Sequence, residues 1–416
     1  IAFATHLRAE DLPADVIHAA KRHLIDTCGA IIGGMQMDVA TKAARVPGVA
    51  TACAGGLPVP GSRLALDGPS FAMLCGTAAH GIELDDGYRE GSCHPGVTVI
   101  PAALAAAATH AASGRELLHA LIVGYEAVAA ISAAAHPALR DRGFHPTSVV
   151  GPLAAALAVG RLLHLSEPDL QNALGIAASS SGGLFAFLDG GGDVKRLHAG
   201  QASRAGLLAA LFAREGISGP ADIIEIASGF AQAFAYGAER ARLAFDLPPS
   251  VPFRTTRCYI KPYACCRHLQ PAIDALIEIM AANALKPADI QRVDVEAYTI
   301  AASHAGTGWD DFASAQLSFP YVMAVAIHHG TVDLGHFEPE TRNDPAIAAD
   351  ARKFRFRATE EMDALYPRQR PSRVSVGTRG RRTQVPWTYS PSPIRYQTSS
   401  CWSRRTACTW TAVLLS

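Results

Sequence analysis

The sequence is poor in charged residues, which make up 18% of its 416 residues, and its 37 Lys and Arg balance its 37 Asp and Glu. Without a net charge the chain has no general electrostatic attraction for nucleic acid or for an anionic membrane, so we expect neither as a partner. Any attraction for an anionic substrate must then come from a local group of residues. The hydrophobic fraction of 49% predicts a globular protein with a large buried core.

The sequence motifs of metal and cofactor sites are also missing. The nine cysteines are scattered and no C-x-x-C or H-x-x-x-H spacing occurs. Neither a P-loop nor a dinucleotide-binding glycine motif after a strand is present, so we expect no metal and no cofactor. An odd cysteine count fits poorly with a disulfide framework and favours reduced thiols in the cytoplasm. The N-terminus shows no basic region followed by an apolar stretch and a cleavage site, so we also expect no signal peptide.

Two long segments lack charge altogether, Gly91–Gly114 and Gly143–Gly160. Both contain Pro and His, and both are rich in Ala, Gly and Val rather than in the Leu, Ile and Phe of a bilayer span. We therefore predict buried helices in a tightly packed bundle.

Residues 1–255 have the periodicity of helices. One helix is expected to open at Pro13–Asp15, and Ser113 and Glu116 form a capping box ahead of another. Ser166 opens a third in the same manner. The apolar face of the first helix is expected at Val16, Ala19, Ala20, His23, Leu24 and Ile25.

The pattern changes near residue 255. Residues 254–260 are β-prone, residues 270–284 favour a helix, and residues 291–298 and 373–376 alternate as half-buried strands do. We therefore predict a mainly α protein, with a large all-helical domain at 1–255 and a smaller α+β domain at 256–385.

The segment 386–416 is an atypical tail. Beyond Asp363 the chain has no Asp, Glu or Lys, while Arg recurs and three of the four Trp follow. A basic interaction tail and a shifted reading frame from about Arg379 both explain this composition. We assign no function to the tail.

Four polar clusters interrupt the apolar framework. They are the acidic loop 81–96 with His94 at its end, the turn 143–148 with His145, the glycine-rich run 189–200 with Lys195, and the segment 259–268 with Lys261. Each alone is explained by a helix cap or a solvated loop. Buried carboxylates are costly unless they are paired, so the acidic loop predicts the wall of a polar pocket.

The order of these clusters resembles the MmgE/PrpD family, which includes 2-methylcitrate dehydratase, cis-aconitate decarboxylase and iminodisuccinate epimerase. The resemblance covers about residues 5–378. It depends on the H-x-x-x-x-D-D loop at 80–86, on the D-V-K-R-L-H run at 193–198, on the Y-I-K strand at 259–261 and on the S-F-P-Y motif at 318–321. It implies a large helical domain with a smaller α+β lid, a pocket between them, and a homodimer. It also implies the pocket residues Asp85, His94, His145, Lys195, Lys261 and Tyr321.

Substrates of this family are small di- and tricarboxylates, and the shared step is abstraction of a proton next to a carboxylate. Lys195 and Lys261 suit stabilisation of the charge that builds on the carboxylate oxygens, and a lysine or a histidine suits the base. The chain departs from the dehydratase and decarboxylase pattern at Glu83, where an Asp is usual, and at Gly87, where a Thr is usual. We therefore expect a metal-independent epimerase of an iminodisuccinate-type substrate. The alternatives are a 2-methylcitrate dehydratase-like hydro-lyase, a cis-aconitate decarboxylase-like lyase, and a non-enzymatic helical scaffold.

Overall fold

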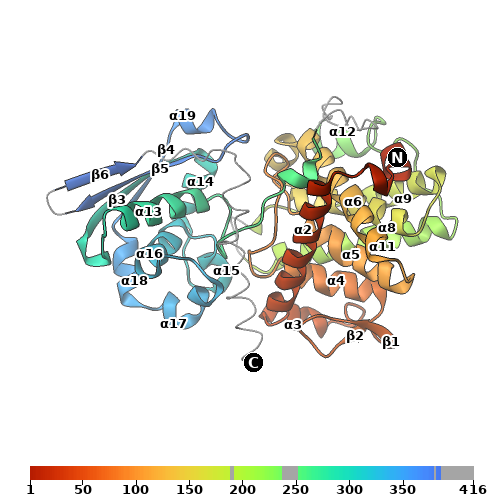
Figure 1. Cartoon of the computed structure of the whole chain (residues 1–416), viewed down its shortest axis with the longest axis horizontal. Helices are drawn as coiled ribbons and strands as arrows, with labels where there is room; N and C mark the ends of the chain where they lie inside the picture. The colour runs from red at the N-terminus through yellow and green to blue at the C-terminus, as the bar shows by residue number, and fades with distance from the viewer. Residues whose placement is uncertain (188–191, 237–251, 379–380, 386–416) are drawn as a thin grey trace. The chain divides into compact units, whose positions relative to one another are not determined.

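The computed structural model describes residues 1–187, 192–236 and 252–378, together with the backbone of 381–385. Part of the glycine-rich run, residues 189–191, and the tail 386–416 lie outside the described residues. The described chain divides after Ile260 into two units, which Figure 1 shows as one mostly helical part and one part built on a sheet.

The first unit is a bundle of helices with one short hairpin. The central helices α4, α5, α8 and α11 pack against one another, and α6 packs on α8 and α5. The bounds of its elements are α1 Ala2–His6, α2 Ala14–Gly34, α3 Asp38–Ala44, β1 Ala52–Pro58, β2 Ala65–Leu66, α4 Gly68–Ala79, α5 Gly96–Thr109, α6 Gly114–Ala135, α7 Ala138–Asp141, α8 Pro146–Leu162, α9 Glu167–Ser179, α11 Val194–Arg214 and α12 Phe230–Ala235.

Glycine contacts let α4 and α11 approach closely. A Cβ on Gly76 would lie 2.9 Å from the Cα of Gly200, and a Cβ on Gly200 would lie 2.2 Å from the carbonyl oxygen of Met73. Side chains larger than hydrogen at either glycine would therefore separate the two helices. This packing fixes the first turn of α11 near the loop that follows α4.

The two uncharged segments form buried helices, α5 and α8, as predicted. Among the described helices α6 alone is long and apolar enough to cross a membrane, and 89% of its most apolar window is buried inside the protein. That environment is the one expected of a core helix.

Local capping signals are confirmed in this unit. Ser113 Oγ accepts from the Glu116 amide at 3.2 Å, and the Glu116 carboxylate accepts from the Ser113 amide at 2.8 Å. Ser166 likewise caps α9, and α2 begins at Ala14. The expected face of α2 needs one correction, because Ile25 is 48% exposed while Asp26 is buried instead.

Two features of the first unit differ from the sequence-based expectation. The hairpin β1–β2 was not foreseen. Residues 254–260 do not form a strand: Arg254–Arg257 is a 3₁₀ turn, and only an isolated bridge pairs Tyr259 with Gly87. The turn is held by Glu126, whose carboxylate accepts bonds from the Thr255 amide and hydroxyl at 2.7 Å each.

The second unit is built on a sheet of strand order β4-β3-β5-β6. Strand β3 pairs parallel to β4 and antiparallel to β5, while helix α13 packs against β5 and helix α16 packs on α13. The predicted helix at 270–284 and the two predicted strands are confirmed. The bounds are α13 Gln270–Ala282, β3 Ile290–Ala297, α14 Thr299–Ser303, α15 Phe312–Ala315, α16 Phe319–His329, α17 Pro339–Arg342, α18 Pro345–Ala351, β4 Phe354–Ala358, α19 Glu360–Asp363, β5 Ser372–Thr378 and β6 Arg381–Val385.

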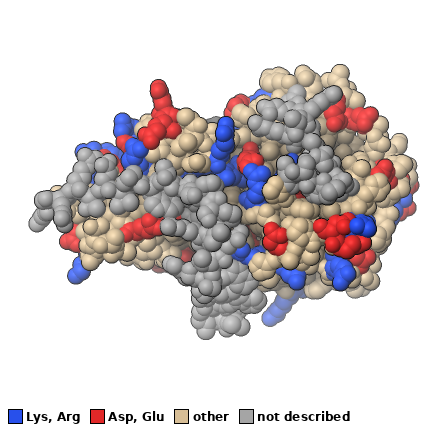
Figure 2. Space-filling model, turned by 45° about the horizontal axis from the view of Figure 1, so that its top comes forward, with Lys and Arg blue, Asp and Glu red and all other residues tan. Residues whose placement is uncertain are grey.

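The surface carries both signs of charge. Figure 2 shows acidic and basic side chains interspersed over the described part of the face that it draws. This mixture agrees with the zero net charge of the chain.

Candidate active site

A buried carboxylate joins two histidines in the loop between α4 and α5. Asp85 Oδ2 lies 2.8 Å from Nδ1 of His80 and 2.8 Å from Nδ1 of His94. Asp85 and His80 are fully buried, while the side chain of His94 is 16% exposed. These three residues are called the Asp85 cluster below. A carboxylate accepts hydrogen bonds, so the two Nδ1 atoms that face Asp85 act as the donors.

Burial keeps His80 of the Asp85 cluster neutral. Burial lowers the pKa of His80 to about 3, against the opposing effect of the Asp85 charge. His80 is therefore neutral at pH 7. His94 donates from Nδ1 to the carbonyl oxygen of Asp86 at 2.7 Å, which also favours the proton on Nδ1. No described residue makes a hydrogen bond to Nε2 of His94, so this atom is placed to accept a proton.

The carboxylate of the second aspartate of the loop, Asp86, contacts residues of the helical framework rather than His80 or His94. Asp86 accepts from the Tyr125 hydroxyl at 2.6 Å and from the Gly96 amide at 2.9 Å, and it lies 2.9 Å from Nδ1 of His23. Burial and the Asp86 charge raise the pKa of Tyr125 well above its usual value, so the phenol stays a donor. Asp86 thus ties the start of α5 to α6 and α2.

His145 stands at the N-terminus of α8 among aromatic rings. Its ring stacks on His80 with centroids 5.8 Å apart, and Phe185 and Phe187 meet it edge-on at 5.6 and 5.2 Å. Its Nδ1 lies 3.1 Å from Nδ1 of His198 on α11. Burial, followed by the neighbouring histidines, lowers the pKa of His145 well below its usual value. A neutral His145 is the form that can serve as either acid or base.

Lys195 forms a buried ion pair with Glu83. Lys195 lies in the first turn of α11, and its Nζ contacts Oε1 of Glu83. Glu83 has a left-handed backbone with φ of 54°, which is uncommon for a residue with a side chain, and it is 3% exposed. Arg196 holds the same loop by donating to the Gly81 carbonyl at 3.2 Å. The loop and the start of α11 therefore position one ammonium group in a buried setting.

Four of the six predicted site residues thus come together in the first unit: Asp85, His94, His145 and Lys195. The charge of Lys195 contributes to the lowered pKa values of His80 and His198, so the lysine lies among the histidines.

Three buried neighbours were missing from the predicted set: His80, Glu83 and His198. The sequence does contain a signal for each of them. His80 opens the H-x-x-x-x-D-D pattern, Glu83 is a departure from the family pattern, and His198 follows Lys195 by one helical turn.

The other two predicted residues belong to the second unit. Lys261 is fully buried. The hydroxyl of Tyr321 donates to the carbonyl oxygen of His336, and its ring stacks on Trp309 with centroids 5.9 Å apart. Burial raises the pKa of Tyr321. Their part in the site stays a prediction from the family resemblance.

The Asp85 cluster also has the composition of a metal site. Its three ligand atoms lie within 4.8 Å of one another, and two imidazoles with a carboxylate suit Zn²⁺. The hydrogen bonds between the histidines and Asp85 account for the same geometry without a metal.

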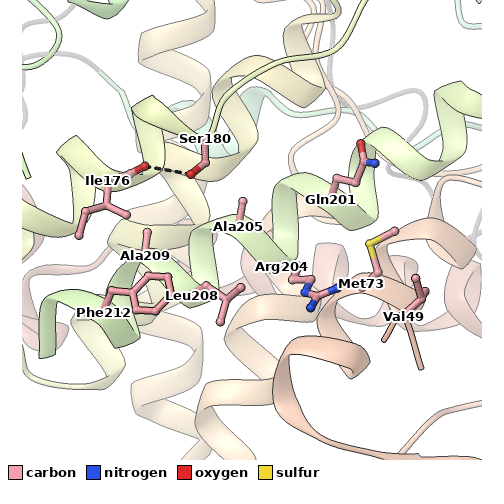
Figure 3. A pocket seen from close by; sticks show the side chains of 10 residues that line it. All are labelled: Val49, Met73, Ile176, Ser180, Gln201, Arg204, Ala205, Leu208, Ala209 and Phe212. Carbon is pink, nitrogen blue, oxygen red and sulfur yellow. Dashed lines mark hydrogen bonds between the residues drawn. The ribbon is translucent and has the colours of Figure 1, made fainter. Parts of the chain in front are cut away.

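A separate hollow of about 330 Å³ lies along α11, between α9 and α4. Figure 3 shows mostly apolar side chains around it, with Ser180, Gln201 and Arg204 as its polar members. Arg204 donates to the carbonyl oxygen of Gly48 at 3.1 Å. None of the predicted site residues lines this hollow, and it holds no pair of acid and base groups, so we do not place the chemistry there.

The fold and the Asp85 loop define a known class of enzyme. The chain belongs to the MmgE/PrpD family: the MmgE/PrpD N-terminal domain matches residues 1–242 and the MmgE/PrpD C-terminal domain matches residues 263–392.

The chain is also similar to several curated proteins that are named for one type of reaction. The chain is 29% identical over 369 residues to the cis-aconitate decarboxylase-like protein oryM of Aspergillus oryzae (strain ATCC 42149 / RIB 40), which covers 83% of this chain and 76% of the relative. It is 29% identical to the cis-aconitate decarboxylase of Aspergillus terreus over 396 residues, 87% of this chain and 78% of the relative. It is 31% identical to the cis-aconitate decarboxylase of Homo sapiens over 234 residues, 55% of this chain and 48% of the relative.

These relatives indicate an enzyme and favour the lyase alternative over the epimerase that we expected from Glu83 and Gly87. The homodimer and the cytoplasmic location stay predictions.

Proposed function

We propose that this chain is a metal-independent lyase that decarboxylates a small unsaturated tricarboxylate of the cis-aconitate type. The observation that carries the proposal is the group of buried Lys195 and His145 with the partly exposed His94 beside the acidic loop. The chain is similar over more than four fifths of its length to cis-aconitate decarboxylases. The 2-methylcitrate dehydratase-like hydro-lyase is the second candidate within the same family.

Decarboxylation needs two things that this site can supply. Breaking the bond to the departing carboxylate leaves an electron pair on the carbon skeleton, and that charge spreads onto the oxygens of a remaining carboxylate. The Lys195 ammonium in a buried position suits stabilisation of this charge, because electrostatic interactions are strong where water is excluded. CO₂ leaves as this bond breaks, and the electron pair then takes a proton from an imidazole. One proton is consumed in each turnover.

Two imidazoles are available for proton transfer: His145 as the donor, and His94 as an acceptor while its proton is on Nδ1. His94 and His145 each have an Nε2 atom without a hydrogen bond to any described residue, and both are held from the other side of the ring. A neutral histidine with a fixed Nδ1 partner transfers a proton through Nε2. The same pair could remove a proton and protonate a leaving hydroxyl, so only the products distinguish a decarboxylase from a dehydratase.

The test compares three substrates with the purified protein in D₂O: cis-aconitate, 2-methylcitrate and one enantiomer of iminodisuccinate. We expect CO₂ release from cis-aconitate and a product with one deuterium on carbon, both measured by NMR and gas detection. Alkene formation from 2-methylcitrate without CO₂ release would move the assignment to the hydro-lyase. Interconversion of iminodisuccinate enantiomers would restore the epimerase.

Site variants test the assignment independently. Lys195→Ala and His145→Ala should each lower kcat on the order of 10²-fold, the usual scale for a positioned acid or base. Lys42→Ala is the matched control, because the side chain of Lys42 is 63% exposed and pairs with Asp38 on the same helix. Near wild-type turnover in both site variants would show that these junctions are structural.

A further inference from the structure

The contact between His145 and His198 joins two nitrogens of the same kind. Nδ1 of His145 lies 3.1 Å from Nδ1 of His198, and both residues are buried, at 2% and 4% exposure. Two lone pairs or two N–H groups at this distance would repel each other. A stable contact therefore requires one proton between the rings, on one Nδ1 or on the other.

Both rings are kept neutral. Burial lowers the pKa of both residues, and the charge of Lys195 lowers that of His198 further. The pair therefore has two tautomeric arrangements. When His145 Nδ1 carries the shared proton, His145 Nε2 is a base. When His198 Nδ1 carries it, the proton of His145 is on Nε2, and His145 is an acid.

The backbone holds the two rings in register. The His145 amide donates to the Gly183 carbonyl at 3.0 Å, and Gly183 has a φ of 122°. A Cβ at Gly183 would lie 2.5 Å from Oγ of Ser148 and 3.4 Å from Cδ2 of His198. Only glycine allows this approach, so the segment fixes both histidines through one residue.

We propose that His198 is a positioning residue that delivers protons to His145, so that the two imidazoles form a relay. The inference rests on the proposed function, in which each turnover consumes one proton. His145 Nε2–H gives its proton to the carbon of the substrate. His145 Nδ1 takes the proton of His198 Nδ1, and His198 Nε2 takes one from water. Both rings end neutral and with the opposite tautomer. One proton has passed from water to product, and the hydroxide that remains combines with the released CO₂ to form bicarbonate.

The relay explains why the Nδ1 atom of His145 faces the Nδ1 atom of a second buried histidine, which a merely structural histidine would not need. Without a proton entering at Nδ1, a neutral His145 that gave its Nε2 proton to the substrate would be left as an imidazolate anion. The Nδ1 contact with His198 supplies that proton to the same ring. Once product has left, the pair resets: His145 Nε2 takes a proton from water, the shared proton returns to His198 Nδ1, and His198 Nε2 releases its proton.

The experiment uses the full chain with His198→Asn and His198→Ala. Asparagine keeps a polar group near Nδ1 but cannot pass a proton through the side chain. We expect kcat to fall roughly 10- to 100-fold in both variants, with KM changed less than threefold. Added imidazole should restore kcat of His198→Ala in proportion to its concentration, because it replaces the lost ring. His119→Asn is the control, since His119 is a buried histidine that contacts Arg161 elsewhere in the bundle.

A wild-type kcat in His198→Asn, or a loss in His198→Ala that imidazole does not restore, would overturn the relay. A second readout needs no substrate: ¹⁵N NMR of histidine-labelled protein should show one protonated and one unprotonated Nδ1 for the pair, and His198→Asn should shift the tautomer of His145. Two protonated or two unprotonated Nδ1 atoms would also overturn it. If cis-aconitate is not decarboxylated but the NMR result holds, the proposed function fails and the pairing stands.

Discussion

The free energy of unfolding of this protein should fall at acid pH because His80 is buried in its neutral form. His80 is fully buried with a folded-state pKa of about 3, against an ordinary value of 6.5. The folded state therefore keeps His80 neutral, and the unfolded chain binds a proton on it as the pH falls below 6.5. Unfolding takes up a proton in this range, so the stabilisation is complete above pH 6.5 and is lost as the pH falls towards 3.

The size of the effect follows from the same values. At pH 5 the unfolded histidine lies 1.5 pH units below its own pKa while the folded one is still neutral. At about 1.36 kcal/mol per unit, lowering the pH from 8 to 5 reduces the free energy of unfolding by about 2 kcal/mol through His80 alone.

Urea unfolding followed by far-ultraviolet circular dichroism measures this loss. The comparison is between wild type and His80→Gln at several pH values, because glutamine can still donate to Asp85 but does not titrate. The gap in stability between the two proteins should shrink by about 2 kcal/mol from pH 8 to pH 5. His164→Gln is the control, since the side chain of His164 is 68% exposed. A pH dependence of His80→Gln that runs parallel to wild type would refute the reasoning.

Three further outcomes are expected. Removal of metals by a chelator should leave kcat unchanged, while micromolar Zn²⁺ should inhibit by binding the Asp85 cluster; activation by Zn²⁺ would contradict this. Glu83→Gln should lower the free energy of unfolding by about 3 kcal/mol, because it removes the carboxylate that pairs with the buried Lys195 ammonium. Combining it with Lys195→Met should recover part of that loss in urea unfolding, and purely additive losses would argue against the ion pair. Tyr125→Phe should lower the free energy of unfolding by about 2 kcal/mol, because the hydrogen bond to Asp86 is lost, and it should leave KM unchanged. A large rise in KM would mean that Asp86 contacts the substrate.

Local patterns were enough to predict much of the fold. The Ser113 capping box depends on residues three apart, and the strand at 290–297 shows its burial through alternation. Both signals depend on residues that are close together in the sequence. The turn at 254–257 could not be predicted in this way, because Glu126, the residue that holds it, lies far away in the sequence. The hairpin β1–β2 could not be predicted because its strands lack an alternating β-branched pattern.

The site was only partly predictable for a similar reason. The family pattern gave Asp85 and Lys195, but not that the adjacent Asp86 turns towards the framework. The backbone geometry of the loop decides which of two neighbouring carboxylates meets the histidines. The contact between His145 and His198 depends on the packing of two helices, and sequence spacing alone does not report it.

The left-handed backbone of Glu83 bears on how this protein can be engineered. A non-glycine residue at a positive φ raises the energy of the folded state by about 1 kcal/mol or more, so Glu83→Gly would relieve backbone strain at that position. The same change deletes the carboxylate that partners Lys195. A selection for heat resistance can combine Glu83→Gly with a neutral residue at 195. The resulting protein would be more stable but would lack the ammonium group that we propose to act in catalysis. Stability screens on this scaffold should hold position 83 constant.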